Sequence, residues 1–326
     1  MLRIKVSNNF KQWPFARQTP GSKGIWGKSE FIINQATDDC DYWVVTGGLD
    51  QTEKTLCNEE NTVFLGGEPP SLIRFNHNFL KQFKHIITCD RKLKHPNNHF
   101  YQQAIPWQIG AYVDKYDYDE LKSMQPPKKT KLISAITSSK DWSAGHKNRI
   151  KFIHQLKEHF GDSMDVFGRG INEIRDKSMG IIDYKYSIAI ENSSYEDYWT
   201  EKLGDVFLGY SFPFYFGCPN IGDYFPENSL IQIDINDLSS SINAIEKAIE
   251  DNSFENNIDK IRQSRELVLD KYNFFPMMDT FCRKNYKKGK KTMIELKPEK
   301  EFEKYNYKKY FNPKKVFLFV KRKLLS

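Results

Sequence analysis

The sequence predicts an α/β fold with two domains. β-Prone runs alternate with segments of helical apolar spacing, which is typical of parallel βα units. One such run is Thr62–Leu65, followed by apolar residues at helical spacing that predict a helix at 71–84. The 326 residues also exceed what one hydrophobic core usually serves. Because a stiff Pro- and Lys-rich stretch at 126–130 separates two α/β units, we expect domains at 1–127 and 128–282 and a basic tail at 283–326.

The formal charge of +7 is concentrated near the end of the sequence. Residues 283–326 contain 16 Lys and Arg against 4 Asp and Glu, a net charge of +12, so the remainder carries 7 − 12 = −5. A mildly acidic body argues against a nucleic-acid enzyme, and we expect no nucleic-acid partner. The tail ends in an apolar run flanked by basic residues, which fits attachment to an anionic membrane. It fits equally a helix that packs on the first domain.

The five cysteines are widely separated and lack metal-ligand spacing: Cys40, Cys57, Cys89, Cys218 and Cys282. This usage favours reduced thiols in a cytosolic protein. The sequence has neither a recognisable signal peptide nor a run of about 18 apolar residues. We therefore expect a cytoplasmic protein, peripheral at the inner face of the membrane if its basic tail binds lipid.

The stretch 184–218 organises the second unit. A β-prone run at 186–190 ends in Glu191-Asn192-Ser193, a polar aromatic loop follows, and Thr200 is the predicted N-cap of a helix. Lys202 then lies in the first helical turn, where the helix dipole disfavours a cation by roughly 0.3–1 kcal/mol. A bound anion would remove this conflict, because helix N-termini with a nearby lysine make phosphate sites. The alternative is a solvated lysine with a weak penalty.

Arg149 shows the same conflict in the helix predicted at 148–160. Both helices follow strands. Two such helices pointing at one diphosphate would account for both cations.

Glu68 is the candidate functional residue of the first unit. It follows the strand Thr62–Leu65 in the run Gly66-Gly67-Glu68-Pro69-Pro70, which places it at the carboxyl end of a strand with open backbone around it. The alternative is that Glu68 merely precedes a proline-started helix whose dipole favours it.

We expect no metal site and no required cofactor, and stimulation by a divalent cation stays open. Two D-x-D pairs occur, Asp39 with Asp41 and Asp117 with Asp119, but both lie in the first domain and are expected to be solvated. His95 and His99 flank a proline that breaks the helix which i,i+4 ligands need, so they are interpreted as loop histidines.

Glu191-Asn192-Ser193, Tyr198 and Thr200-Glu201-Lys202 together resemble the donor-binding motif of glycosyltransferase family 10, the α1,3/α1,4-fucosyltransferases. The similarity runs from about residue 131 to 234 and includes Asp165–Gly170. It implies the GT-B fold, in which two Rossmann-like domains face each other across a cleft. The absence of an N-terminal anchor indicates a soluble bacterial or viral-type member.

The resemblance implies transfer of L-fucose from GDP-fucose, with inversion, to a hydroxyl of a GlcNAc- or glucose-containing glycan such as lipopolysaccharide or another surface glycan. Glu68 would be the catalytic base, and Arg149, Lys202 and Tyr198 would bind the diphosphate. Asn192 and Glu201 would position ribose, fucose or phosphate. Residues 194–197 and Gly204-Asp205 depart from the family pattern. A GT-B enzyme for another nucleotide sugar, or a non-catalytic glycan-binding protein of the same fold, remains an alternative.

Overall fold

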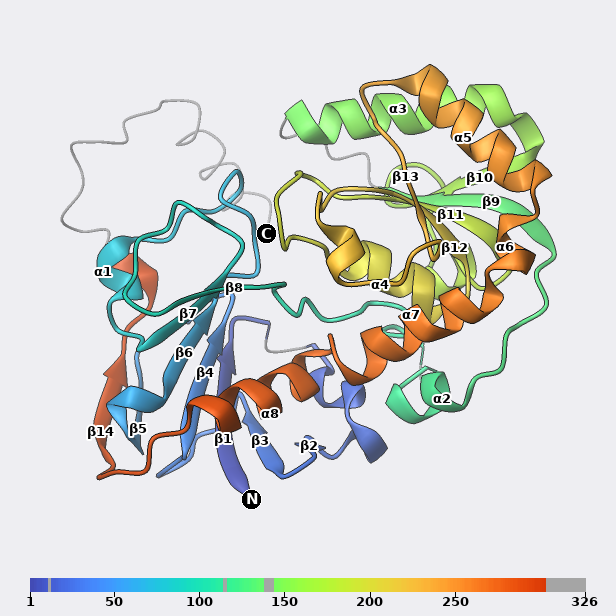
Figure 1. Cartoon of the computed structure of the whole chain (residues 1–326). Helices are drawn as coiled ribbons and strands as arrows, with labels where there is room; N and C mark the ends of the chain where they lie inside the picture. The colour runs from blue at the N-terminus through green and yellow to red at the C-terminus, as the bar shows by residue number, and fades with distance from the viewer. Residues whose placement is uncertain (11–12, 114–115, 138–143, 303–326) are drawn as a thin grey trace.

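The computed structural model describes residues 1–10, 13–113, 116–137 and 144–302, with the side chains of residues 144–147 outside this description. It contains two α/β domains, each built on a mostly parallel sheet, that lie beside one another (Figure 1). This is the GT-B arrangement of two Rossmann-like domains, which confirms the predicted fold class. In such sheets ligands bind at the carboxyl ends of the strands, where the strand order reverses.

The first sheet has the order β2-β3-β1-β4-β6-β7-β8. Neighbouring strands pair in parallel except for the antiparallel pair β2 and β3. Because β3 and β4 lie on opposite sides of β1, the strand order reverses between β1 and β4. The strands are β1 (Leu2–Asn8), β2 (Ile25–Trp26), β3 (Ser29–Ile33), β4 (Tyr42–Thr46), β6 (Thr62–Leu65), β7 (His85–Thr88) and β8 (Asn98–Phe100).

The second sheet is parallel throughout, with the order β10-β9-β11-β12-β13. Since β10 and β11 flank β9, this order reverses between β9 and β11, so Thr137 and Glu191 follow the two strands at the reversal point. The strands are β9 (Lys131–Ile136), β10 (Met164–Phe167), β11 (Tyr184–Ile190), β12 (Phe212–Phe216) and β13 (Ile231–Gln232).

Helices cover both faces of the second sheet, with α3 and α5 on one side and α4 and α7 on the other (Figure 1). The helices are α1 (His77–Leu80), α2 (Tyr118–Ser123), α3 (Ala144–Phe160), α4 (Glu201–Leu208), α5 (Leu238–Glu250), α6 (Ser253–Asn256), α7 (Ile258–Asp270) and α8 (Phe274–Asn285). Short 3₁₀ helices connect them: η1 (Phe15–Gln18), η2 (Pro20–Ser22), η3 (Glu59–Asn61), η4 (Gly161–Ser163), η5 (Lys177–Gly180), η6 (Ile221–Asp223) and η7 (Glu299–Glu301).

The chain crosses between the two cores twice, and neither crossing falls at a predicted boundary. Trp107 and Ile109 are buried in the core of the second domain although they precede residue 127. Phe274 and Met278 of α8 are buried in the core of the first domain although they precede residue 282. Burial of apolar side chains in whichever core they reach, and not the Pro-Lys stretch, decides which domain each segment joins.

Part of the predicted tail belongs to the first domain. Strand β14 (Thr292–Leu296) pairs antiparallel with β5 (Glu53–Cys57), and Leu296 is buried in a cluster of first-domain side chains. The apolar run predicted to attach to a membrane falls within 303–326, outside the described residues. In the part of the chain that the structure does describe, no helix combines the length and apolar character required to cross a bilayer.

Two predicted helices differ in extent. The helix predicted at 71–84 is only α1, because Asn76 caps it by accepting a hydrogen bond from the backbone N–H of Asn78. Helix α3 begins at Ala144 and not at residue 148. Arg149 is therefore in its second turn, and the expected conflict with the dipole of the first turn is wrong for this residue.

Candidate active site

The carboxylate of Glu191 connects the end of β11 to the start of α4. It is almost completely buried and accepts hydrogen bonds from Thr200 N (2.8 Å) and from Thr200 Oγ1 (2.9 and 2.8 Å). Thr200 in turn caps α4 by accepting from the backbone N–H of Lys202. The predicted N-cap, and the place of Lys202 in the first turn, are confirmed. Glu191 was recognised only as part of the motif, without a role of its own.

Lys202 is neutralised by carboxylates of its own domain. Its Nζ lies 3.2 Å from Glu191 Oε2 and 3.6 Å from Glu201 Oε1. Burial alone would lower the pKa of Lys202, but the two carboxylates outweigh burial and raise it. The chain itself therefore balances the cation at this helix N-terminus, which the sequence argument had left to a bound anion.

Lys177, which the sequence analysis missed, completes this charge cluster. It lies on η5 and its Nζ is 2.9 Å from Asp205 Oδ2 and 3.4 Å from Glu201 Oε1. Burial opposes ionisation of Glu201, yet Lys202 and Lys177 lower the pKa of that carboxyl group to about 2. No sequence signal pointed to Lys177, because its partner Asp205 is 28 residues away.

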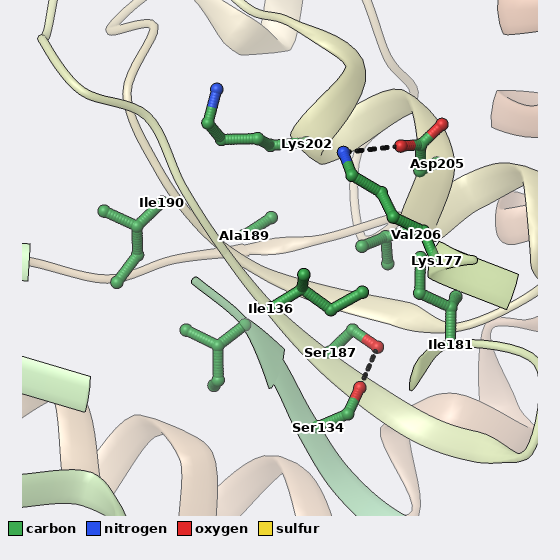
Figure 2. Close-up of a pocket in the computed structure, with 11 residues that line it drawn as sticks. Ser134, Ile136, Lys177, Ile181, Ser187, Ala189, Ile190, Lys202, Asp205 and Val206 are labelled. Carbon is green, nitrogen blue, oxygen red and sulfur yellow. Dashed lines mark hydrogen bonds and ion pairs between the residues drawn. The ribbon is translucent and has the colours of Figure 1, made fainter. Parts of the chain in front are cut away.

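A small cavity lies beneath this cluster, between the sheet and α4. Figure 2 shows the hydrogen bond between Lys177 and Asp205. On the opposite side of the cavity, Ser134 of β9 is hydrogen-bonded to Ser187 of β11. The cavity has a volume of about 30 Å³ and Lys202 also lines it. A water molecule needs about 10–15 Å³ of such space, so this cavity is large enough for water and too small for a nucleotide.

Arg149 and Asn192 meet at the point where the strand order of the second sheet reverses. Arg149 is 6% exposed, and its Nη1 donates a hydrogen bond to Asn192 Oδ1. Burial lowers the pKa of Arg149, while Glu191 and Glu201 act in the opposite direction. Its Nε is buried and has no hydrogen-bond partner among the residues that the structure describes. A buried guanidinium N–H without an acceptor is a donor available to an anionic ligand.

Glu68 lies in a separate pocket of about 240 Å³ in the first domain. This pocket opens at the carboxyl ends of β1, β4 and β6, where the strand order of the first sheet reverses. Three aromatic side chains and four amide side chains contribute to its lining: Phe10, Trp13, Phe15, Asn8, Asn9, Gln103 and Gln108. Gly67 takes a positive φ of 77°, a backbone conformation that favours glycine.

Desolvation and the charges of the second domain act on Glu68. Its side chain is solvent-exposed, but the surrounding protein removes part of its hydration and raises its pKa. Lys202 lowers this pKa, whereas Glu201 and Glu191 raise it. Tyr198 is almost fully buried, and burial, followed by the charges of Glu191 and Glu68, raises the pKa of its hydroxyl. The structure thus brings all six predicted site residues, Glu68, Arg149, Asn192, Tyr198, Glu201 and Lys202, to one interdomain region.

The two D-x-D pairs form structural contacts and are not simply solvated as expected. Lys291 Nζ lies 2.7 Å from Asp39 Oδ2 and 2.8 Å from Asp41 Oδ1. Asp117 caps α2, and Asp119 accepts a hydrogen bond from Gly21 N at 2.6 Å. The contacts of Asp39 and Asp41 stabilise the first domain. Helix α2, which Asp117 caps and Asp119 joins to Gly21, packs instead on the second core.

The histidines also have partners. His95 Nε2 lies 3.1 Å from Phe83 O, and His99 is in β8, not in a loop, with its Nε2 3.0 Å from His85 Nδ1. Across the described ranges, no group of three or more His, Cys, Asp or Glu residues is arranged to hold a metal ion.

Residues 126–256 match the family model "Glycosyltransferase family 10 (fucosyltransferase) C-term". The chain is 35% identical over 104 residues to alpha-(1,3)-fucosyltransferase 4 of Rattus norvegicus, covering 28% of this chain and 24% of that protein. It is 31% identical over 113 residues to 4-galactosyl-N-acetylglucosaminide 3-alpha-L-fucosyltransferase 9 of Mus musculus, covering 33% and 30%. The chain thus spans about a quarter to a third of the length of these curated relatives.

Among solved structures, the chain is similar to a crystal structure of alpha1,3-fucosyltransferase with GDP, with a TM-score of 0.48 and 16% identity over 83% of this chain and 92% of that one. The family match covers the second sheet and the helix that begins after Thr200, where Glu191, Asn192 and Lys202 lie. The similarity to glycosyltransferase family 10 therefore lies in this domain.

Proposed function

We propose that this protein is an inverting fucosyltransferase that moves L-fucose from GDP-fucose to a hydroxyl of a GlcNAc- or glucose-containing glycan. The observation that carries the proposal is electrostatic: Glu68, in the pocket of the first domain, has a pKa affected by Lys202, Glu201 and Glu191 of the second. A base on one side of a cleft and a charged donor motif on the other suit a transfer between two substrates.

The donor is assigned to the second domain. The reversal point between β9 and β11 is where an open α/β sheet binds its ligand, and the N-terminus of α4 adds a positive dipole end. Arg149 supports this assignment because its buried Nε has no acceptor among the described residues. Arg149 and Lys202 would stabilise charge on the GDP leaving group as the bond to fucose breaks. Asn192, Tyr198 and Glu201 would orient the donor.

The acceptor is assigned to the 240 Å³ pocket of the first domain. Its aromatic and amide lining suits the apolar face and the hydroxyls of a sugar. As the acceptor hydroxyl attacks the anomeric carbon, Glu68 would take up its proton, and GDP would leave from the opposite side with inversion. A pKa above the ordinary carboxyl value makes Glu68 a stronger base than a fully hydrated glutamate.

Metal independence is part of the proposal. Arg149 and Lys202 are assigned the neutralisation of charge on the leaving group that a divalent cation supplies in metal-dependent transferases. A divalent ion could then stimulate the reaction without being required. We further propose a cytoplasmic protein that contacts an anionic membrane through residues 303–326, and a surface glycan such as lipopolysaccharide as acceptor.

The test is GDP or UDP release from a panel of nucleotide sugars, measured with and without acceptor glycans. The proposal expects release from GDP-fucose that depends on a GlcNAc- or glucose-containing acceptor. Preference for another nucleotide sugar would favour the alternative GT-B transferase. Binding of the glycan without release from any donor would favour a non-catalytic glycan-binding protein.

A further inference from the structure

The loop 192–200, called the donor-site loop below, also contacts the first domain. The contact is centred on Asp197, a non-glycine residue with a left-handed φ of 59° and a side chain only 8% exposed. Within the second domain its Oδ1 accepts hydrogen bonds from Tyr224 Oη (2.6 Å) and Asn220 Nδ2 (3.1 Å). Its backbone N–H donates to Asn220 Oδ1 at 2.9 Å. These contacts hold a backbone conformation that is costly for a residue with a side chain.

The other oxygen of the same carboxylate faces the first domain. Asp197 Oδ2 is ion-paired and hydrogen-bonded with Nη2 of Arg91, which follows strand β7. Arg91 Nε lies 3.2 Å from Glu196 Oε2, and the guanidinium carbon lies 4.5 Å from the ring centroid of Phe100 on β8. One guanidinium therefore joins two carboxylates of the donor-site loop to a ring of the first domain. Planar, stacked recognition of this kind favours arginine over lysine.

A second contact lies near the other end of the loop. Ser71 Oγ of the first domain lies 2.7 Å from Ser193 Oγ. The two contacts thus involve the immediate neighbours of Asn192 and Tyr198, the residues of this loop assigned to the donor. Arg91 and Ser71 are on the same domain as Glu68, so both contacts set the position of the loop relative to the proposed base.

We propose that Arg91 and Asp197 are positioning residues that hold the donor-site loop closed on the first domain and so fix the distance between Glu68 and the donor. This inference rests on the proposed function for its catalytic consequence, but the closure itself does not depend on the reaction. Arg91 is assigned no contact with substrate. It acts by keeping two domains in one arrangement, which brings reacting groups into place before the reaction.

The closure is tested by cross-linking. Ser71→Cys combined with Ser193→Cys introduces two thiols where two hydroxyls are in contact, and the five natural cysteines are all buried and free. With oxidised glutathione, the disulfide should form readily in this double-cysteine variant and about fivefold more slowly when Arg91→Ala is added. The matched control is Arg262→Ala, since Arg262 is 45% exposed and Arg91 is 44% exposed, and the partner of Arg262, Asp259, is on the same helix. This control should cross-link at the rate of the double-cysteine variant.

Equal cross-linking rates with and without Arg91 would overturn the proposal, and so would no cross-link in the double-cysteine variant. Arg91→Lys keeps a cation for Asp197 but loses the planar fork, so it should give an intermediate rate. Denaturant unfolding of each variant distinguishes an effect on closure from an effect on folding. Equal unfolding midpoints are expected because Arg91 is half exposed.

The catalytic consequence is tested by kinetics on the same variants. Arg91→Ala should lower kcat/KM for transfer from GDP-fucose about three- to tenfold, and Arg91→Lys should recover part of it. GDP affinity should change less than twofold, because the second domain supplies the diphosphate ligands. A normal kcat/KM in Arg91→Ala would overturn the catalytic role. If the parent protein transfers no fucose while the cross-linking depends on Arg91, the proposed function fails and the closure stands.

Discussion

The ammonium group of Lys202 lies 3.2 Å from the carboxylate of Glu191, a residue that is only 1% exposed. This pair gives the motif a structural role in addition to its proposed role in donor binding. Glu191 orders Thr200 and Lys202, so the strand end, the N-cap and the first helical turn form one unit. Lys202 is thus a structural residue as well as a candidate ligand, and its replacement affects folding and binding together.

Lys202→Ala should destabilise the fold by about 3–5 kcal/mol, because it leaves the buried carboxylate of Glu191 without its cation. Adding Glu191→Gln should restore much of this loss, since the amide carries no charge. Lys185→Ala, which breaks the half-exposed pair with Glu255, is the control and should cost less than about 1 kcal/mol. Urea unfolding of the four proteins measures this. An equal loss of unfolding free energy in Lys202→Ala and Lys185→Ala would show that the buried pair with Glu191 stabilises the fold no more than an exposed pair does.

Glu68→Gln should change the pH dependence of stability and abolish transfer. The folded-state pKa of Glu68 is raised, so the native protein binds a proton more tightly than the unfolded chain. Its contribution to stability therefore decreases as pH rises from the ordinary carboxyl pKa through the raised value. The glutamine variant should lack this decrease and be at least as stable as the parent at neutral pH, while its transfer activity is lost. Unfolding measured between pH 4 and pH 8 tests this, and a variant less stable at neutral pH would contradict it.

Treatment with a chelator such as EDTA should leave most of the transfer activity. The reason is that Arg149 and Lys202 are assigned the charge on the diphosphate. Initial rates with chelator, and then with added Mg²⁺ or Mn²⁺, measure the effect. Complete loss of transfer activity with chelator and its recovery with metal would contradict that assignment. The candidate metal ligands would then be Asp39, Asp41, Asp117 and Asp119.

Removal of residues 310–326 should release the protein from anionic vesicles at low salt. The removed residues carry five Lys and Arg and no Asp or Glu, and each basic residue near an anionic surface contributes about 1 kcal/mol. Sedimentation with phosphatidylserine vesicles compares the truncated and full-length proteins, with neutral vesicles as control. Full-length protein that ignores anionic vesicles would exclude the membrane contact.

The sequence was sufficient for those parts of the site that are local in the chain. The strand end at Glu191, the cap at Thr200 and the first turn at Lys202 lie within twelve residues, so strand, cap and helix signals identify them together. Glu68 could be found because two glycines follow a strand. The start of α3 was missed because its first residues, Ala144-Gly145-His146-Lys147, carry no apolar period.

Contacts between distant residues could not be predicted in this way. Lys177 pairs with Asp205, and Arg91 with Asp197 at a separation of 106 residues, without any local pattern. The two crossings of the chain between the domains could not be predicted either. The apolar character of Trp107 and Phe274 predicts that they are buried, but not in which of the two cores they lie. A single sequence contains no direct record of such pairs.

The proposed site is tested most directly by comparing GDP binding with fucose transfer in Glu68→Ala and Arg149→Ala. Calorimetry with GDP and initial rates with GDP-fucose and acceptor supply the two quantities for each variant. We predict that Glu68→Ala binds GDP like the parent while transfer falls about 10²–10⁴-fold, because the base acts only when the acceptor attacks. Arg149→Ala should weaken GDP binding and slow transfer together. Near-normal transfer by Glu68→Ala, or unchanged GDP affinity in Arg149→Ala, would contradict the proposed site.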